Sequence, residues 1–231
     1  MLLLLKFKNR LLFYKELENM KKFFSILVLF IFTSFAFAQS VELKKLCSKL
    51  AEHPITKGDF VQIKTINSAK GKRQLKSNGT FIFSLNGIMW KSEKPFPSTM
   101  VIGPDYLIQI DGAGNKTITD VSNNQAFANV ASTIISVFSN DYELLTNSFE
   151  TQLITENTEN YLIRLNPKDT TIASVIGQID LSLQTNQSLS EVTLSSILMT
   201  EVSGNTTSYT FTNQSYPREL SKDEKDIFIF K

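Results

Sequence analysis

The chain has 231 residues, 42% of them hydrophobic and 20% charged, with a formal net charge of +2. The first 38 residues hold six of the 24 Lys and Arg residues and two of the 22 Asp and Glu residues. The remaining 18 basic and 20 acidic residues give a net charge of −2. This balance excludes the strongly basic surface expected of a nucleic-acid-binding protein, and the length is sufficient for one domain.

Residues 20–38 show the three-part pattern of a secretory signal peptide. Two lysines follow Met20, an apolar stretch covers residues 23–37, and the segment ends in Ala36-Phe37-Ala38. We therefore expect export and cleavage after Ala38. A membrane anchor is the alternative, but about 15 apolar residues fall short of the roughly 20 that span a bilayer. Residues 1–19 are interpreted as a mis-assigned N-terminal extension, Met20 as the start, and residues 39–231 as a single domain.

An amphipathic helix is predicted from Val41 to Ala51. Its apolar residues recur at the spacing of one helical face, at Leu43, Leu46, Cys47 and Leu50. Ser40 is a candidate N-cap, and Pro54 ends the helix. The same stripe makes Cys47 a small buried thiol. As the only cysteine it cannot form an internal disulfide, and it lacks the small-residue box of a lipidation site.

A tight hairpin is predicted at Asn86-Gly87, because both residues of this dipeptide favour the positive φ angles of a two-residue turn. Such a turn pairs Leu85 with Ile88, Phe83 with Trp90 and Phe81 with Ser92. Partners across a hairpin share a face, and faces alternate every two residues. Phe81, Phe83, Leu85, Ile88 and Trp90 are therefore predicted to form one apolar face, which is either an ordinary core face or the wall of a cavity.

Short strands are predicted along most of the remaining chain. They cover Phe60–Ile66, Gln74–Ser84, Ile88–Glu93, Thr99–Ile102, Tyr106–Ile110, Thr117–Val121, Phe149–Thr155, Tyr161–Asn166, Gly177–Gln184, Leu189–Met199 and Thr206–Asn213. Lys94-Pro95-Phe96-Pro97 interrupts the series, because proline is excluded from central strands. A helical insertion is predicted where Phe127, Ala131, Ile134, Ile135 and Phe138 have helical spacing, followed by a short helix at residues 141–145. The pattern predicts a mainly β fold, an antiparallel meander curved into a barrel or half-barrel.

The sequence contains little that supports catalysis. His53 is the only histidine and lies beside Pro54, with no nucleophile motif around it. One His and one Cys fall short of the usual zinc ligand sets. Asp223, Glu224 and Asp226 are interpreted as a solvated acidic tail. We predict no catalytic residue, no metal site and no cofactor, and the protein is not expected to be an enzyme; a hydrolase using His53 or paired carboxylates is a minor alternative.

Several motifs resemble the LolA family of lipoprotein carriers, and most closely a divergent subgroup of it. Phe60, Gln62 and Lys64 match an F-x-Q-x-K motif that follows the first helix. Ser77 and Gly79 match a serine-glycine entry to the next strand, Gly87 and Trp90 match G-x-x-W, and residues 95–99 read P-F-P-S-T. These motifs cover about 45 residues, and the order of the later elements agrees with the family over the rest of the chain.

The resemblance implies an open antiparallel half-barrel covered by helices, and a periplasmic carrier without enzymatic activity. Its cargo would be acylated lipoprotein or lipid, received from an inner-membrane releasing complex and passed to an outer-membrane acceptor by a monomeric carrier. The cavity wall would then comprise Phe81, Phe83, Leu85, Ile88 and Trp90, and the helical lid would supply Phe127, Ile134 and Phe138.

One departure from the family concerns the closure of the lid. Family members carry an arginine just before the hairpin turn that latches the lid in the empty state, whereas this chain has Ser84 or Leu85 there. A second function is compatible with the same fold: a regulatory module that senses envelope lipoproteins and binds a protein partner. A third is a structural β domain in which the predicted apolar face is filled core.

Overall fold

The computed structural model describes residues 41–103, 106–120, 135–137, 139–186, 188 and 190–228. The chain divides into two compact units, residues 1–42 and 43–231, and the fold below is that of the second unit. The predicted signal peptide and N-terminal extension lie outside the described residues, and the domain limits stay a prediction. Phe127, Ile134 and Phe138 of the predicted lid also lie outside the described residues.

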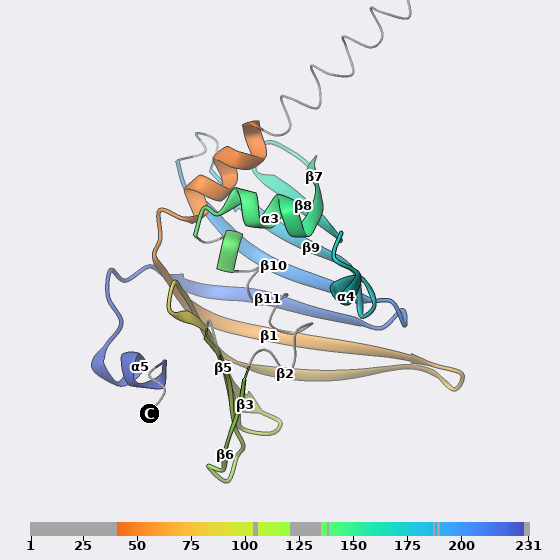
Figure 1. The fold of residues 1–231 in the computed structure, drawn as a ribbon, viewed down its shortest axis with the longest axis vertical. Coiled ribbons are helices and arrows are strands. Elements are labelled where there is room, and N and C mark those ends of the chain that lie inside the picture. The colour runs from red at the N-terminus through yellow and green to blue at the C-terminus, as the bar shows by residue number, and fades with distance from the viewer. Residues whose placement is uncertain are drawn as a thin grey trace, which may run out of the picture. The chain divides into compact units, whose positions relative to one another are not determined.

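Eleven strands form one antiparallel sheet (Figure 1). The first six strands are β1 Ile55–Ser68, β2 Gly71–Ser84, β3 Gly87–Lys94, β4 Ser98–Ile102, β5 Tyr106–Ile110 and β6 Lys116–Asp120. The other five are β7 Phe149–Thr155, β8 Asn160–Pro167, β9 Ile176–Thr185, β10 Val192–Glu201 and β11 Thr206–Ser215. Each of the eleven predicted strands is therefore present, and the prediction of a mainly β antiparallel fold is confirmed.

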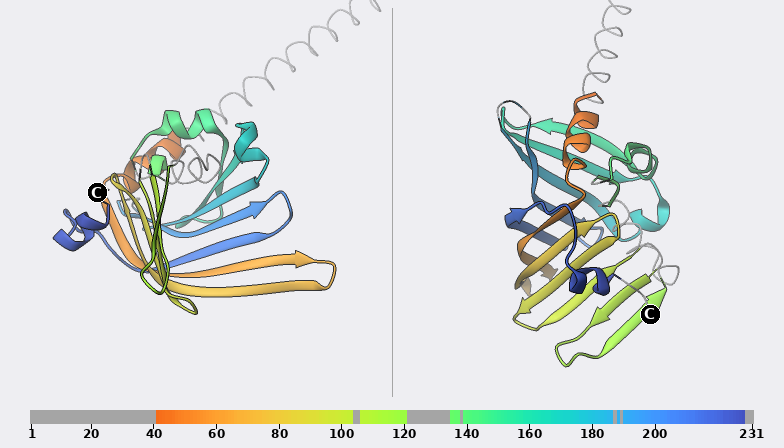
Figure 2. Two further views of the ribbon diagram at one scale, coloured as in Figure 1. Left: turned by 60° about the horizontal axis from the view of Figure 1, so that its bottom comes forward. Right: turned by 90° about the vertical axis from the view of Figure 1, so that its left-hand side faces the viewer.

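The strand order is β6-β5-β4-β3-β2-β1-β11-β10-β9-β8-β7. Two meanders of chain neighbours are thus joined at one seam, where β1 pairs with β11 and Phe60 lies opposite Phe211. Among the described strands, β6 and β7 each have one neighbour, so the sheet stays open at both edges. Figure 2 shows that the sheet is strongly curved, so that it has a concave and a convex face.

The hairpin between β2 and β3 has a different register from the predicted one. Phe81 pairs with Trp90, Phe83 with Ile88 and Ser84 with Gly87, so Leu85 and Asn86 form the turn. Asn86 is not among the described non-glycine residues with positive φ, whereas Gly87 has a φ of 134°. A Cβ on Gly87 would lie 2.1 Å from the Ile102 carbonyl oxygen. The close approach of β4 therefore requires glycine at this position.

The predicted face survives this shift in register. A strand that slides by two residues keeps its side chains on the same face, whereas a slide by one would invert them. Phe81, Phe83, Ile88 and Trp90 are all buried in one apolar cluster. Leu85 is the exception: it lies in the turn with 60% of its surface exposed, so its predicted pairing with Ile88 and its place on the buried face are wrong.

Short helices accompany the sheet. The predicted first helix is present at residues 41–50, and Leu43, Leu46, Cys47 and Leu50 are all buried, which confirms the predicted stripe. The other complete helices of the described chain are α3 Tyr142–Ser148, α4 Thr170–Ala173 and α5 Lys222–Ile227. Asp141 caps α3, since its side chain accepts a hydrogen bond from the Leu144 amide at 2.9 Å.

Helix α5 corrects, for Glu224, the interpretation of Asp223, Glu224 and Asp226 as a solvated acidic tail. Ser221 and Glu224 form a capping box at its start. The Lys57 ammonium donates to the Glu224 carboxylate at 2.5 Å, and both side chains are about three-quarters buried. Leu220 and Phe228 flank the helix and are buried against the sheet. Asp223 and Asp226 are exposed, as that interpretation expects, but Glu224 is paired and the helix packs on the protein.

Both faces of the first meander are covered by apolar side chains. The concave face carries the larger cluster, which includes Phe81, Phe83, Ile88 and Trp90 together with the buried side of the helix at residues 43–50. The alternate residues Ile82 and Met89 point to the opposite face and pack with Val101, Ile108, Leu220 and Phe228. This two-sided burial explains why residues 81–83 of β2 and 88–90 of β3 form continuous apolar runs instead of a strict alternation.

Candidate functional site: a cavity on the concave face

Aromatic rings gather on the concave face around the seam between β1 and β11. Phe81 lies 4.6 Å from Phe83 and 4.7 Å from Phe211 between ring centroids. Trp90 lies 5.6 Å from Phe83, edge to face, and 5.7 Å from Tyr209. These separations fall in the range in which aromatic pairs attract one another beyond the burial of area. The result is a closely packed aromatic floor built from both meanders.

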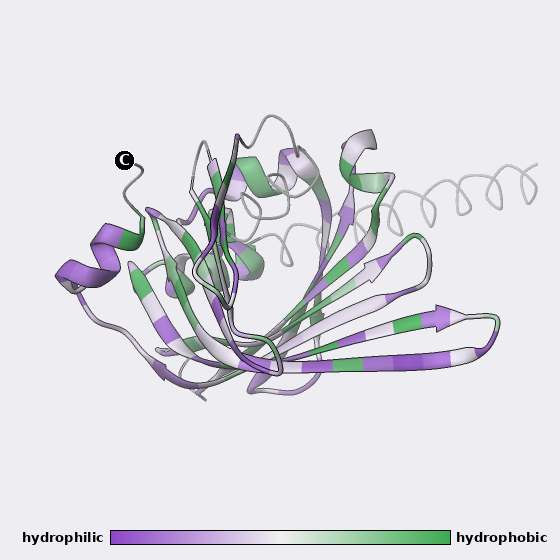
Figure 3. Cartoon of the chain, turned by 90° about the horizontal axis from the view of Figure 1, so that it is seen from below, coloured by the Kyte–Doolittle hydropathy of each residue, from purple (hydrophilic) through white to green (hydrophobic). Residues whose placement is uncertain are grey.

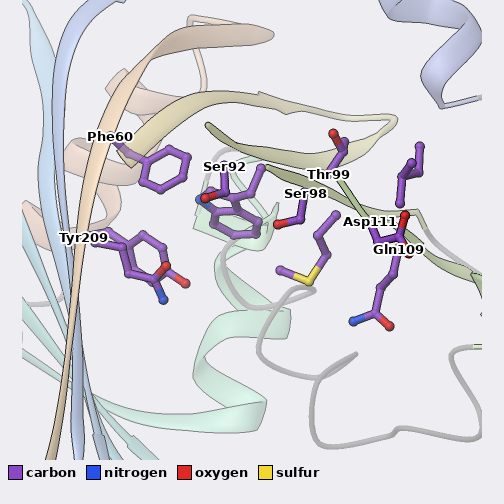
Figure 4. Close-up of a pocket in the computed structure, with 11 residues that line it drawn as sticks. Phe60, Ser92, Ser98, Thr99, Gln109, Asp111 and Tyr209 are labelled. Atoms are coloured by element: carbon purple, nitrogen blue, oxygen red, sulfur yellow. The ribbon is translucent and has the colours of Figure 1, made fainter. Parts of the chain in front are cut away.

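A cavity of about 300 Å³ lies beside this floor (Figure 4). Its apolar wall contains Phe60, Trp90, Met100 and Tyr209. Its polar wall contains Gln62, Ser92, Ser98 and Gln109, with Thr99, Ile110 and Asp111 at the margin. Among the residues predicted for the binding wall, Trp90 lines this cavity. Phe81, Phe83 and Ile88 lie in the core, each no more than 2% exposed.

The register of the strands explains why the space is open at this place. A row of large side chains crosses the strands, because Phe81 pairs with Trp90 and Trp90 with Met100. The neighbouring row is small, because Gly79 pairs with Ser92 and Ser92 with Ser98. The large side chains of the first row fill the concave face. The small residues of the second row leave an open space beside the aromatic cluster.

Trp90 presents an unsatisfied hydrogen-bond donor at the cavity. Its indole Nε1 is buried, and no described residue or side chain accepts a hydrogen bond from it. A buried donor without a partner costs roughly 1–3 kcal/mol, so such groups usually mark a site where something else accepts the hydrogen bond. Because the nitrogen itself is closed to solvent, the carbonyl oxygen of a bound molecule would reach this donor only after the indole or its neighbours shift.

The polar wall is held by local hydrogen bonds. The Ser77 hydroxyl donates to Gln62 Oε1 at 2.8 Å. The Asp111 carboxylate accepts from the amides of Ala113 and Asn115 and from the Asn115 side chain, which closes the turn between β5 and β6. These bonds, led by that of the Asn115 side chain, lower the pKa of Asp111. Asp111 is thus an ionised turn residue at the margin and is engaged in structure.

Two buried groups near the floor are uncharged at physiological pH. Burial raises the pKa of the Tyr209 hydroxyl and of the Cys47 thiol, each to about 12. Because a thiol reacts as the thiolate, Cys47 is chemically inert in the folded protein. Neither group provides a nucleophile or an acid–base pair for catalysis.

His53 lies outside the cavity. Its ring stacks on Tyr216 with centroids 3.9 Å apart, after the end of the first helix. Within the described part of the chain, no group of three or more His, Cys, Asp or Glu residues is arranged to hold a metal ion. In the same described residues, no helix is long and apolar enough to cross a membrane.

The positions that match the latch arginine of the resembled family lie at the hairpin turn. Ser84 is buried, and its hydroxyl donates to the Gly87 carbonyl oxygen at 3.2 Å. Leu85 is exposed. Neither side chain can form the ion pair or bidentate hydrogen bonds that an arginine would provide.

Several residues of the cavity were missed by reasoning from sequence. Met100, Gln109 and Tyr209 line it, and Phe211 completes its floor. Met100 and Gln109 could have been found from the pairing of successive strands. Tyr209 and Phe211 could not, because β11 pairs with β1 from the far end of the chain and no local signal gives that register.

The fold and site define a curved antiparallel β-sheet protein with a cavity beside an aromatic floor, one wall of which is apolar and the other polar. The family model of the outer membrane lipoprotein carrier protein LolA matches residues 54–230. The chain therefore belongs to the LolA family. No curated protein matches the sequence.

Solved structures similar to this chain include those of three bacterial proteins. A LolA superfamily protein from Nitrosomonas europaea is 14% identical, with 83% of this chain and 97% of that chain covered and a TM-score of 0.44. A domain assigned as an outer membrane lipoprotein-sorting protein, from Vibrio parahaemolyticus, is 11% identical, with coverage of 81% and 97% and a TM-score of 0.42. A DUF1329 family protein from Desulfovibrio piger is 9% identical, with coverage of 78% and 92% and a TM-score of 0.44.

Proposed function

We propose that this protein is a periplasmic carrier that binds acyl chains of lipoproteins or related lipids on its concave face and moves them toward the outer membrane. The observation that supports this best is the cavity bounded by Phe60, Trp90, Met100 and Tyr209. Membership of a family named for a lipoprotein carrier agrees with it. Uptake from an inner-membrane releasing complex and delivery to an outer-membrane acceptor belong to the same proposal.

The size of the cavity limits what it holds without rearrangement. A volume of about 300 Å³ corresponds to roughly ten groups of water size at about 30 Å³ each. Burial of ten methylenes contributes about 8 kcal/mol at about 0.8 kcal/mol each, against roughly 4–15 kcal/mol for association. The cavity as it stands therefore suits part of one acyl chain, and firm retention of a multiply acylated lipid needs more apolar surface.

The helices are the proposed source of that surface. Leu43, Leu46 and Leu50 of the first helix, and Leu145 of α3, share the apolar cluster with the concave face of the sheet. Displacement of these helices would uncover apolar side chains that the cargo covers in turn. We include Phe127, Ile134 and Phe138 in this lid. With Ser84 or Leu85 at the latch position, closure depends on apolar packing.

Acyl-chain uptake tests the proposal directly. The exported protein is purified, its N-terminus is identified by mass, and it is delipidated before titration with a fluorescent fatty acid and a triacylated lipopeptide. Met100→Glu places a charge in the cavity wall and is expected to weaken binding at least tenfold. Leu198→Glu makes the same change at a residue that is 38% exposed on β10, outside the apolar clusters, and should bind as the wild type does.

Two results would overturn the proposal: folded wild-type protein that takes up neither probe, or Met100→Glu protein that binds as tightly as the control. Trp90→Phe tests the indole donor separately, because it keeps an aromatic ring and removes the N–H. It should weaken an acyl ester by roughly three- to tenfold relative to an alkane of equal length. A stable complex with an envelope protein and no transfer of cargo would favour the regulatory module instead.

A further inference from the structure

The hairpin of β1 and β2 ends in a strongly basic arm, defined here as residues 64–76. Its five cations are Lys64, Lys70, Lys72, Arg73 and Lys76, and the chain has no acidic residue between Asp59 and Glu93. Residues 43–231 contain 18 Lys and Arg against 19 Asp and Glu, so without the arm 13 basic and 19 acidic residues leave −6. The arm is therefore a local positive feature on an otherwise acidic protein.

The arm projects because its neighbours end before it does. β2 pairs with β3 only from Asn78 onward, and β1 pairs with β11 only as far as Thr65. Figures 1 and 2 show the hairpin extending past the adjacent strands, and Figure 3 shows that its end is mostly hydrophilic. Near its end, the β1 side of the arm is braced by the turn between β10 and β11, where the Asn67 amide donates to Asn205 Oδ1 at 2.9 Å.

The charges surround the arm instead of lining one face. Lys64 pairs with Leu75, and Ile66 with Arg73, on the face continuous with Phe60. Lys72 and Lys76 alternate with these and point to the other face. Lys70 lies in the turn. Lys70, Lys72, Arg73 and Lys76 are exposed and form no ion pair with a described residue, and Leu75 is 50% exposed among them.

This distribution decides between possible occupants. If the cations bound cargo in the cavity, they would lie on the concave face alone. If they only protected an open strand edge from pairing, they need not continue around the turn. Cations on both faces and at the tip, with a half-exposed leucine between them, fit a broad anionic surface met end-on. We propose that the arm docks the protein on anionic phospholipid headgroups of a membrane surface. Its use as a delivery step rests on the proposed carrier function.

Charge complementarity gives the expected strength of this contact. Each Lys or Arg close to an anionic leaflet strengthens binding by roughly fivefold. Four exposed cations therefore supply an effect on the order of several hundredfold. Because the rest of residues 43–231 carries a net negative charge, the anionic membrane repels that part of the protein. This repulsion orients the arm toward the membrane. The attraction falls off within a Debye length of about 8 Å at physiological salt, so binding should weaken steeply as salt is raised.

Sedimentation with lipid vesicles tests the docking. The exported, delipidated protein is mixed with vesicles of phosphatidylcholine alone or with about 30% phosphatidylglycerol. The arm variant carries Lys70→Gln, Lys72→Gln, Arg73→Gln and Lys76→Gln. The control variant removes the same charge elsewhere, from exposed residues that form no ion pair with a described residue: Lys45→Gln, Lys116→Gln, Arg218→Gln and Lys222→Gln. Circular dichroism confirms folding of both.

Wild-type protein should prefer the anionic vesicles, the arm variant should lose at least about 100-fold in affinity, and the control should change by less than about threefold. The docking is refuted if wild-type protein shows no preference, if the arm variant binds unchanged, or if the control loses as much. Arm-dependent binding to polyglutamate without binding to vesicles also refutes it, in favour of an acidic protein partner.

Fatty-acid uptake by the same variants separates this inference from the carrier function. Normal uptake without vesicle binding overturns the docking alone. Vesicle binding without uptake overturns the carrier function and supports the docking as a property of the arm.

Discussion

Gly79→Ala should destabilise the protein although it adds a single methyl group. A Cβ on Gly79 would lie 1.9 Å from the Lys91 carbonyl oxygen and 2.9 Å from the Lys91 carbonyl carbon and Ser92 Cα. All three are backbone atoms of β3, which cannot turn aside as a flexible side chain would. Since Cβ contacts under 3.0 Å are essentially not seen in proteins, β3 must move by about 1 Å at the edge of the cavity.

The expected loss of stability in Gly79→Ala has two sources, overpacking at the new methyl group and strain in the hydrogen bonds between β2 and β3. Overpacking of a close contact costs roughly 1–3 kcal/mol, and each hydrogen bond strained in the β2–β3 ladder adds roughly 0.5–1.5 kcal/mol. We expect the free energy of unfolding to fall by about 2–4 kcal/mol. Urea denaturation followed by far-UV circular dichroism measures this as a lower midpoint with an unchanged slope.

Gly177→Ala on β9 is the matched control. There the nearest atom, the Thr200 carbonyl oxygen, would lie 3.5 Å from the new Cβ, and φ lies outside the left-handed region. The methyl group reduces the freedom of the unfolded chain, so this variant should be unchanged or more stable by about 0.5 kcal/mol. Equal midpoints for Gly79→Ala and the wild type would refute the close approach of β2 to β3, and with it the register that forms the cavity.

Three further predictions concern single side chains. Cys47 should not react with a thiol reagent at pH 8 until denaturant is added, since burial raises its pKa to about 12; rapid labelling of native protein would contradict this burial. Hydrogen bonding from Lys57 lowers the pKa of Glu224 in the folded protein. The ionised Glu224 carboxylate therefore stabilises the fold above the unfolded-state pKa of about 4.3, and this stabilisation is lost as the pH falls through the lower folded-state pKa. Glu224→Gln should therefore destabilise by about 1 kcal/mol at pH 7 and by progressively less below pH 4.5, whereas a difference that grows in acid would reverse the assigned sign. Ile88→Ala should cost about 2–4 kcal/mol and Leu85→Ala less than about 0.5 kcal/mol in the same denaturation assay, because only Ile88 is buried; similar losses would restore Leu85 to the core.

Local patterns in the sequence predicted local structure well. The stripe of Leu43, Leu46, Cys47 and Leu50 has the period of one helical face, and all four residues are buried as expected. The face shared by Phe81, Phe83, Ile88 and Trp90 was also predicted correctly, although the pairing was displaced by two residues. Alternation determines the face, but the conformation of the turn determines the register, and the Asn-Gly rule placed the turn one residue too late.

Features that depend on distant parts of the chain were not predicted. Glu224 was interpreted as solvated because its partner Lys57 lies at the other end of the domain. Tyr209 enters the cavity only through the pairing of β11 with β1, and the hollow itself arises from the alignment of Gly79, Ser92 and Ser98 across three strands. These contacts require the register of the whole sheet, which no motif in the sequence provides.

The single seam between the two meanders has a consequence for the order of folding. Every other ladder in the described sheet joins strands that follow one another in the chain and can form as local hairpins, whereas Phe60 meets Phe211 only after nearly the whole sequence has emerged. Contacts between such distant residues form late because loop closure is entropically unfavourable. Tyr209 reaches Phe60 and Trp90 by the same event. We therefore expect a nascent or C-terminally truncated chain to have ordered hairpins and no capacity for ligand, so that binding competence itself reports the completion of synthesis.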